Sequence, residues 1–149
     1  MNDYYEYRHV VSFAETNALG TVYFTAHLAW QGRCREMFLR EKAPSILREL
    51  GRGGLVFVTL HASCDYLGEL APFDEVAVRM RLETMRRNRM SMSFEILKIA
   101  PDHDPVRIAT GRQKIACMRE VDGHFMPEPF PSAMVDALAP YRCEASTEN

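Results

Sequence analysis

The sequence predicts an α+β fold in which a strongly curved antiparallel sheet wraps around one long helix. A helical segment within residues 15–39 is apolar on two opposite sides, so both sides need cover. The segments after residue 55 alternate apolar and polar residues with a period of two, which is typical of half-buried strands. Because no further long helix separates these strands, a doubly wound sheet is not expected. The 149 residues predict one domain, spanning residues 1–149.

The chain opens with a strand and the long helix. Residues 5–13 alternate in character and lead into a polar loop, so we expect a strand there. Thr25 is the expected N-cap of the helix that follows. At 100° per residue the helix has two apolar faces, formed by Ala26, Trp30, Cys34, Met37 and Phe38 and by Leu28, Gly32 and Leu39. We expect the sheet to cover one side and a second subunit the other, with Gly32 at a close backbone approach.

A polar row interrupts the apolar surface of this helix. His27, Gln31 and Arg35 are spaced i, i+4 and i+8, so they form a ridge that starts beside the helix N-terminus. On an average helix such a row points to solvent. Apolar residues flank this row on both sides, which favours a position facing the interior.

Four more segments complete a predicted sheet of five strands. After a short helical turn at 46–50 and a glycine cluster at 51–54, strands are expected at 55–66, 76–82, 90–96 and 106–118. Gly111 is expected to mark a bulge in the last strand. A short helix from Pro131 through Leu138 should then cover one end of the sheet.

The loop in front of the long helix has the features of half an acyl-transfer site. It delivers Asn17 and Gly20 close to the helix N-terminus. A helix N-terminus offers free N–H groups and a partial positive charge, which suit a carbonyl whose oxygen gains negative charge during reaction.

The segment from Asn17 to Arg35 resembles the active-site signature of hot-dog-fold thioesterases of the 4-hydroxybenzoyl-CoA thioesterase type. That signature has an acidic residue, two further residues, Gly, then Val-Tyr, an aromatic residue, and a helix that ends in Arg. The stretches ETN, VYF and HLAWQGRCREMFLRE, followed by Ala43 and Pro44, are similar to the thioesterases of enediyne polyketide biosynthesis. The resemblance covers most of the chain and is most specific from Glu15 to Pro44.

The resemblance implies the hot-dog fold, assembled as dimers and as a tetramer of two dimers. It also implies hydrolysis of a long polyene acyl thioester, with a β-keto group, from the acyl carrier protein of an iterative enediyne polyketide synthase. The released β-keto acid would lose carbon dioxide to give a polyene or a methyl ketone. Two other functions stay open: a general acyl-CoA thioesterase, and a non-catalytic module that binds a carrier protein.

The resemblance assigns catalytic roles to Asn17 and Arg35, which would hold the thioester and the attacking water. The broader family usually carries Asp at the position of Asn17, and an amide can serve neither as nucleophile nor as general base. The enzyme would therefore lack the usual acidic catalytic residue. A retained Arg35 favours catalysis, because a semi-buried cation is costly to keep. Five further positions are expected to bind substrate, namely Gly20, Tyr23, His27, Gln31 and Thr59.

Three of those positions need a comment. His27 stands where relatives commonly carry Tyr, and Gln31 stands where they commonly carry Glu, so the roles of both stay open. In the hot-dog family the strand that contains Thr59 approaches the helix end of the neighbouring subunit. Thr59 would therefore line the pocket of a second chain.

Arginines gather in the predicted hairpin. Between residues 79 and 89 the chain has five arginines and one acidic residue, although its net charge is −2. These arginines are Arg79, Arg81, Arg86, Arg87 and Arg89. Their field would attract the acidic surface of an acyl carrier protein or the phosphates of coenzyme A. The alternative is a solvated sheet face whose edge is protected by charge.

The composition argues against several classes of protein. The slight negative charge argues against nucleic-acid binding, and no apolar run reaches 18 residues, so we expect a cytoplasmic protein without a membrane span. The cysteines, Cys34, Cys64, Cys117 and Cys143, lack metal-ligand spacing, so neither a metal nor an organic cofactor is expected. Cys34 lies beside a cation that can activate a thiol, but its place on the core face favours packing. The nine methionines are either core residues or the lining of an adaptable tunnel for a long acyl chain.

Overall fold

The computed structural model describes residues 3–143. The elements follow in the order β1 (Tyr5–Val10), η1 (Phe13–Glu15), α1 (Thr25–Lys42), α2 (Pro44–Arg52), β2 (Leu55–Tyr66), β3 (Glu75–Met85), β4 (Arg89–Ile99), β5 (Val106–Val121), β6 (His124–Pro127), α3 (Ser132–Leu138) and η2 (Ala139–Tyr141). The elements η1 and η2 are short 3₁₀ helices. Within the described range, no helix combines the length and the apolar character that a membrane crossing requires.

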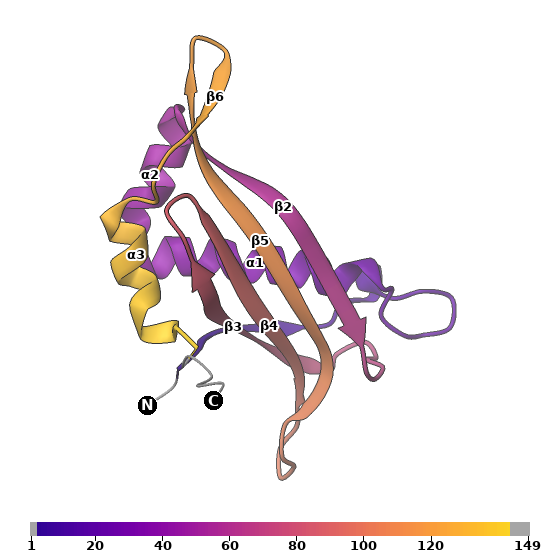
Figure 1. Ribbon diagram of the computed structural model, residues 1–149. Coiled ribbons are helices and arrows are strands. Elements are labelled where there is room, and N and C mark those ends of the chain that lie inside the picture. Colours follow the sequence, from indigo (N-terminus) through magenta and orange to yellow (C-terminus); the bar gives the residue numbers. More distant parts are fainter. Residues whose placement is uncertain (1–2, 144–149) are drawn as a thin grey trace, which may run out of the picture.

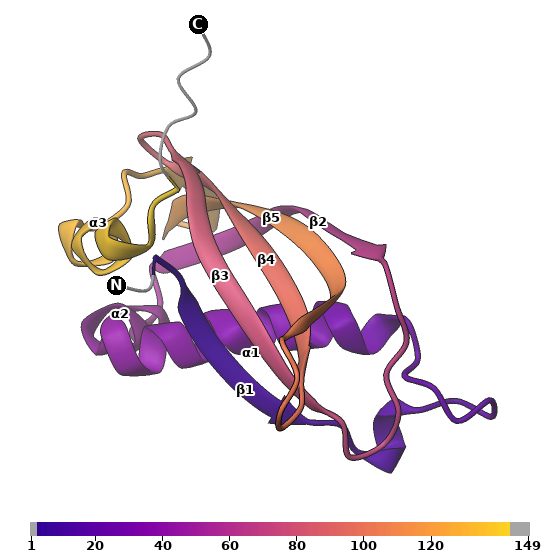
Figure 2. The ribbon, with the colours of Figure 1, turned by 90° about the horizontal axis from the view of Figure 1, so that it is seen from below.

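The strands form one antiparallel sheet in the order β1-β3-β4-β5-β2. The sheet is curled, and α1 crosses its concave side, as Figures 1 and 2 show. The helices α2 and α3 lie together at one end of α1 (Figure 1). The predicted α+β fold, with a curved five-stranded sheet around the long helix, is confirmed.

A sixth short strand extends the sheet beyond the prediction. The strand β5 continues to Val121 and not only to residue 118, and a turn at Asp122 and Gly123 leads into β6, which pairs back onto β5. Both turn residues have positive φ, 50° and 78°. The sequence did not reveal β6 because its four residues are all exposed and give no alternation to detect.

The boundaries of the first elements also differ from the prediction. The strand β1 ends at Val10 because Ser12 and Glu15 form a capping box around η1. The helix α1 begins at Thr25, so its N-cap is Phe24 and not Thr25. The Phe24 carbonyl oxygen accepts a hydrogen bond from the Tyr66 hydroxyl (2.5 Å), which ties the helix start to the end of β2.

The helix α1 buries one side against the sheet. Ala26, Trp30, Cys34 and Phe38 are each 9% exposed or less, which confirms four of the five residues of the predicted apolar face, whereas Met37 is half-buried. His27 and Gln31 are buried as well, at 3% and 0% exposure, so the polar row faces the interior, as the flanking residues indicated. The opposite side, with Leu28, Gly32 and Leu39, is half-buried. A Cβ added at Gly32 would meet nothing within 4 Å, so this chain makes no close approach there.

Gly111 does not mark a bulge. It pairs in register with Cys64 and Phe94, and the register shifts fall elsewhere, beside Thr59, Leu82 and Ile96. A Cβ at Gly111 would lie 2.0 Å from Gln31 Nε2, so a glycine is required because a polar side chain fills the space above the sheet.

Candidate active site

The loop before α1 closes into a turn around Asn17. The Asn17 N–H donates to the Thr21 carbonyl (2.9 Å), and the Gly20 N–H donates to the Asn17 carbonyl (3.0 Å). The side-chain oxygen Oδ1 of Asn17 accepts the Leu19 N–H (2.9 Å). Gly20 has φ +80°, which explains why a glycine stands there. These bonds use Oδ1 and leave the Nδ2 hydrogens of Asn17 to other partners.

Aromatic side chains surround the N-terminus of α1. Tyr23 and Phe24 are about half exposed, with their ring centroids 4.7 Å apart. His27 is buried, with its ring centroid 4.9 Å from that of Tyr66 and 5.1 Å from that of Trp30. Burial lowers the pKa of His27, so its imidazole is neutral at pH 7. The helix start is therefore an apolar surface next to the first turn of α1, where the Ala26 N–H donates to the Tyr23 carbonyl (3.0 Å).

A buried polar chain supports Arg35 in the middle of the helix. The Arg35 guanidinium donates to Gln113 Oε1 (2.8 Å), Gln113 Nε2 donates to Gln31 Oε1 (3.0 Å), and Gln31 Nε2 donates to the Ser63 carbonyl (3.1 Å). This chain joins α1, β5 and β2. It explains why Gln31 of the polar row is buried, and it adds Gln113, which was not among the predicted site residues.

Arg35 faces an apolar pocket without a carboxylate partner. Among residues 3–143 no Asp or Glu oxygen lies within 4 Å of its guanidinium. Burial lowers the pKa of Arg35, although the guanidinium stays charged at neutral pH. The other residues that line the pocket are Phe38, Leu39, Phe57, Met80, Met92, Ile115 and Met134. The remaining cavity is small, about 10 Å³, the space of one water molecule.

The predicted site residues therefore fall in two places on one chain. Asn17, Gly20, Tyr23 and His27 gather at the start of α1, whereas Arg35 lies ten residues beyond Thr25, roughly 15 Å along the helix axis. Thr59 is exposed on β2, an edge strand that pairs with β5 only.

The arginines of the hairpin divide into two groups. Arg79 pairs with Glu6 (3.0 Å), and Arg81 pairs with Glu95 (2.5 Å). Arg86 and Arg89 line a hollow of about 520 Å³ on the outer face of the sheet.

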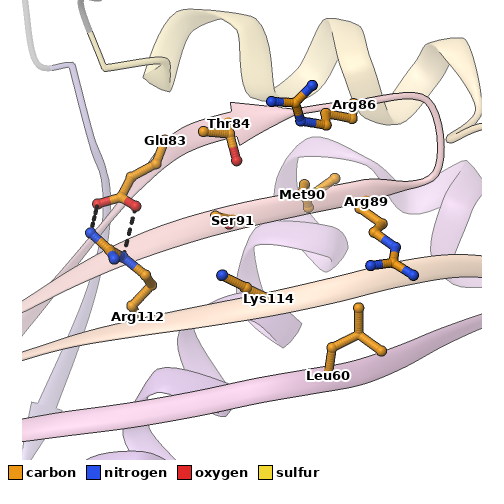
Figure 3. Close-up of a pocket in the computed structure, with 9 residues that line it drawn as sticks. All are labelled: Leu60, Glu83, Thr84, Arg86, Arg89, Met90, Ser91, Arg112 and Lys114. Atoms are coloured by element: carbon orange, nitrogen blue, oxygen red, sulfur yellow. Dashed lines mark hydrogen bonds and ion pairs between the residues drawn. The ribbon is translucent and has the colours of Figure 1, made fainter. Parts of the chain in front are cut away.

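Figure 3 shows the other side chains of this hollow. Lys114 of β5 and Leu60 of β2 also line it, and nearby Arg112 pairs with Glu83 (2.8 Å). Arg87 lies at the adjacent turn and is exposed. The described residues give no ion pair to Arg86, Arg87, Arg89 or Lys114.

The cysteines take no part in this site. Cys34 is fully buried, with its Sγ 3.7 Å from the Val78 carbonyl oxygen, and burial raises the pKa of its thiol. A thiolate nucleophile at Cys34 is therefore disfavoured. Within residues 3–143 no group of three or more His, Cys, Asp or Glu side chains could hold a metal ion.

Comparison with known proteins agrees with this architecture. A family model described as the thioesterase-like superfamily matches residues 11–138. The structure of the dynemicin thioesterase is 42% identical, with a TM-score of 0.90 over 95% of this chain and 99% of that chain.

Two more distant structures share the fold. A 1,4-dihydroxy-2-naphthoyl-CoA thioesterase from Synechocystis is 20% identical, with a TM-score of 0.81 over 91% of this chain and 96% of its own. A 4-hydroxybenzoyl-CoA thioesterase is 12% identical, with a TM-score of 0.79 over 92% of this chain and 99% of its own. The chain therefore belongs to the thioesterase-like superfamily, as a thioester hydrolase of the hot-dog fold that is similar to an enediyne-pathway thioesterase.

Proposed function

We propose that this enzyme hydrolyses a long polyene acyl thioester, with a β-keto group, from the acyl carrier protein of an iterative enediyne polyketide synthase. The observation that carries the proposal is Arg35, a cation at an apolar pocket whose hydrogen-bond partner is the neutral amide of Gln113 (2.8 Å). Such a group suits an apolar chain that carries a polar carbonyl. The 42% identity to the dynemicin thioesterase, whose structures describe polyene binding, supports the same substrate class.

The chemistry assigned to the site is direct attack by water. The water oxygen adds to the thioester carbonyl carbon, the carbon–sulfur bond breaks, and the thiol of the carrier arm leaves with a proton. N–H groups at the start of α1 that make no intrahelical bond would stabilise the oxyanion. Asn17 would orient the water or the thioester at the helix start. Arg35 lies roughly 15 Å further along α1 on the same chain, so it would hold the released β-keto carboxylate rather than the carbonyl under attack. The β-keto acid would then lose carbon dioxide.

A long acyl chain would have to open the pocket beside Arg35. The cavity there holds about 10 Å³, far less than a polyene requires. Met80, Met92 and Met134 line it, and unbranched thioether side chains change rotamer easily. We infer that these methionines rearrange when the substrate binds.

The proposed enzyme acts as a homo-oligomer, a dimer or a dimer of dimers. The sheet ends in β2, and the described chain leaves the outer edge of that strand unpaired. Exposed apolar side chains lie along β2 and at the helix start, among them Val58, Leu60 and Phe24. A partner placed at this edge would bring its Thr59 toward the helix start of the first chain.

Carrier docking is proposed for the basic surface of the β3–β4 hairpin. Arg86, Arg87 and Arg89 are exposed there and are available to acidic groups. Arg79 and Arg81 are engaged with Glu6 and Glu95, so we expect them to contribute less.

The test is release of free acid or methyl ketone from a β-ketoacyl carrier protein, beside a small acyl-CoA. We expect Asn17→Ala and Arg35→Ala each to lower turnover of the carrier substrate by about 100-fold, the usual cost of losing oxyanion-type stabilisation. Equal turnover of the acyl-CoA would favour a general acyl-CoA thioesterase, for which the hollow beside Arg89 would bind the phosphates. Binding of the carrier protein without turnover would contradict an enzymatic function.

A further inference from the structure

A cluster around Glu15 has no role in the steps above. Glu15 ends η1 and stands two positions before Asn17. Its carboxylate accepts hydrogen bonds from the Ser12 N–H (2.9 Å) and hydroxyl (3.1 Å), and it pairs with His9 Nε2 (2.8 and 3.0 Å). The indole N–H of Trp30 donates a further bond to it (2.5 Å). Both carboxylate oxygens are therefore occupied.

Trp30 gives this carboxylate a fixed attachment to the core. Its side chain is 3% exposed and packs 5.2 Å from the His9 ring, centroid to centroid. A buried indole N–H needs an acceptor, because leaving it without one costs free energy. Glu15 is that acceptor. The Glu15 side chain thus joins the loop before α1 to Trp30, which lies more than one turn beyond the start of that helix.

A short backbone ladder carries this attachment from Glu15 to Asn17. The Glu15 carbonyl accepts the Tyr23 N–H (2.8 Å), and the next residues along the ladder form an isolated β-bridge. The Asn17 N–H then reaches the Thr21 carbonyl (2.9 Å). The turn beyond these bonds projects from the body of the protein, as Figures 1 and 2 show. Glu15 therefore lies at the base of the turn that presents Asn17.

We propose that Glu15 is a positioning residue that holds the Asn17 turn at the start of α1 through its bonds to Trp30 and His9. The inference rests on the proposed function, because it assumes that Asn17 takes part in hydrolysis. Glu15 itself is poorly suited to act as a base. Burial would raise the pKa of its carboxyl, but the donors on Ser12, His9 and Trp30 outweigh that effect and hold the pKa below its usual range.

The first test is Glu15→Gln, which keeps the size of the side chain and replaces one acceptor oxygen with an NH₂ group. The glutamine side chain has one acceptor oxygen, whereas both oxygens of Glu15 accept hydrogen bonds from His9 and Trp30. At least one of these bonds is therefore lost, and the Asn17 turn should shift. Trp30 is the single tryptophan of the chain, and its fluorescence therefore reports on the bond directly. We expect a change in emission and a fall in kcat of about 10-fold or more, with KM little changed, because the cost is one of geometry.

A double-mutant cycle separates positioning from a general loss of structure. If Glu15 acts through Asn17, then Glu15→Gln lowers kcat in the wild-type background and has no further effect in the Asn17→Ala background. Glu36→Gln is the matched control, because Glu36 is exposed on α1 and pairs only with nearby Arg33 (2.9 Å) among the described residues. It should leave emission and kcat unchanged.

The outcomes distinguish the two proposals. If Asn17→Ala hydrolyses the thioester as fast as the wild type, the role of Asn17 in the proposed function fails, and the role of Glu15 falls with it. If Asn17→Ala loses activity while Glu15→Gln keeps the wild-type rate, only the positioning role is overturned. Equal fold-losses from Glu15→Gln in both backgrounds also overturn it. Should Glu15→Gln not fold, Trp30→Phe removes the same bond from the helix side and enters the same cycle.

Discussion

One absent methyl group makes room for the polar chain behind Arg35. A Cβ at Gly111 would lie 2.0 Å from Gln31 Nε2 and 2.6 Å from the Ser63 carbonyl oxygen. Those two atoms already bond to each other at 3.1 Å, and one of them belongs to the backbone. Neither can retreat without breaking the chain. Gly111 is therefore a packing requirement of the site.

Gly111→Ala should lower the free energy of unfolding by about 1–3 kcal/mol, the usual cost of overpacking a core. Urea denaturation monitored by circular dichroism measures this. The control is Gly51→Ala in α2, where a Cβ meets nothing within 4 Å. That change should be neutral or stabilising by up to about 1 kcal/mol, because alanine favours a helix. Equal stability of the two variants would contradict the steric role of Gly111.

Gln113→Glu tests whether the neutrality of Gln113 matters. The new carboxylate would form an ion pair with Arg35, so the guanidinium would no longer be available to the substrate. The variant would also lose the hydrogen bond that Gln113 donates to Gln31. We expect kcat/KM to fall at least about 10-fold, since a charge-assisted bond is stronger than a neutral one. The measurement is steady-state hydrolysis at pH 7.5. Undiminished hydrolysis would show that Arg35 does not have to be free of a carboxylate.

At the scale of elements, a carboxylate on β4 links three neighbouring strands. Glu95 accepts hydrogen bonds from Arg81 of β3 (2.5 Å) and from Arg107 of β5 (2.7 Å). Burial would raise the pKa of Glu95, but the two arginines outweigh it and hold the pKa below its usual range. The outer face of the sheet is therefore stabilised by ion pairs as well as by its backbone ladder.

Glu95→Gln should flatten the acid side of the stability profile. A carboxyl with a depressed folded-state pKa adds stability above its unfolded pKa, about 4.3, and that stability is lost as pH falls through the folded-state pKa. The wild type should lose about 1 kcal/mol more than the variant between pH 6 and pH 3, the scale of partly exposed pairs. Thermal unfolding across this range measures it, with exposed Glu36→Gln as the control. Parallel profiles for wild type and Glu95→Gln would contradict the link.

At the scale of the whole molecule, the second side of α1 is a surface that the described chain covers only in part. The sheet covers one side of this helix, whereas Leu28, Gly32 and Leu39 remain half-buried. Nothing in the described chain comes within 4 Å of a Cβ at Gly32. A second chain packed against this side would account for the glycine at position 32. A close approach between subunits at Gly32 therefore stays a prediction.

Gly32→Glu tests this face directly. The described chain has room for the side chain, so the variant should fold, but a closely packed partner would be displaced. We expect the mass measured by light scattering to fall to that of a smaller assembly. Gly51→Glu, at the other open helical glycine, should leave the mass unchanged. If Gly32→Glu keeps the wild-type mass, the oligomer uses another face.

Periodicity predicted most of the fold and the inward direction of the polar row. The alternation of β3 and β4 is regular, and the apolar residues on both sides of His27 and Gln31 left little room for solvent. It could not predict β6, whose four exposed residues carry no pattern. The N-cap was misplaced because the cap position, Phe24, makes no side-chain hydrogen bond to the helix, so its residue type gave no capping signal.

The candidate site was predicted less completely, because its contacts join distant segments. Gln113 shares the inward direction of Ile115 and Cys117 on β5, and this is the one local signal that a polar residue stood in the core. Its bonds to Arg35 and Gln31 span 78 and 82 residues, a pairing that no local pattern contains. The requirement for glycine at position 111 also comes from residues far away in the sequence, Gln31 and Ser63, so no local pattern predicted it.

The nearly filled cavity beside Arg35 also bears on how chain length is recognised. In an open tunnel, affinity would rise evenly with each carbon added to the acyl chain. In a closed pocket, the acyl chain must first displace packed side chains, so only chains above a minimum length bind well. Each buried CH₂ returns about 0.8 kcal/mol, roughly a fourfold gain in affinity. Hydrolysis of a graded series of acyl thioesters should therefore stay low for short chains and rise steeply once the opening cost is met. A constant increment from the shortest chain onward would indicate a pocket that is already open.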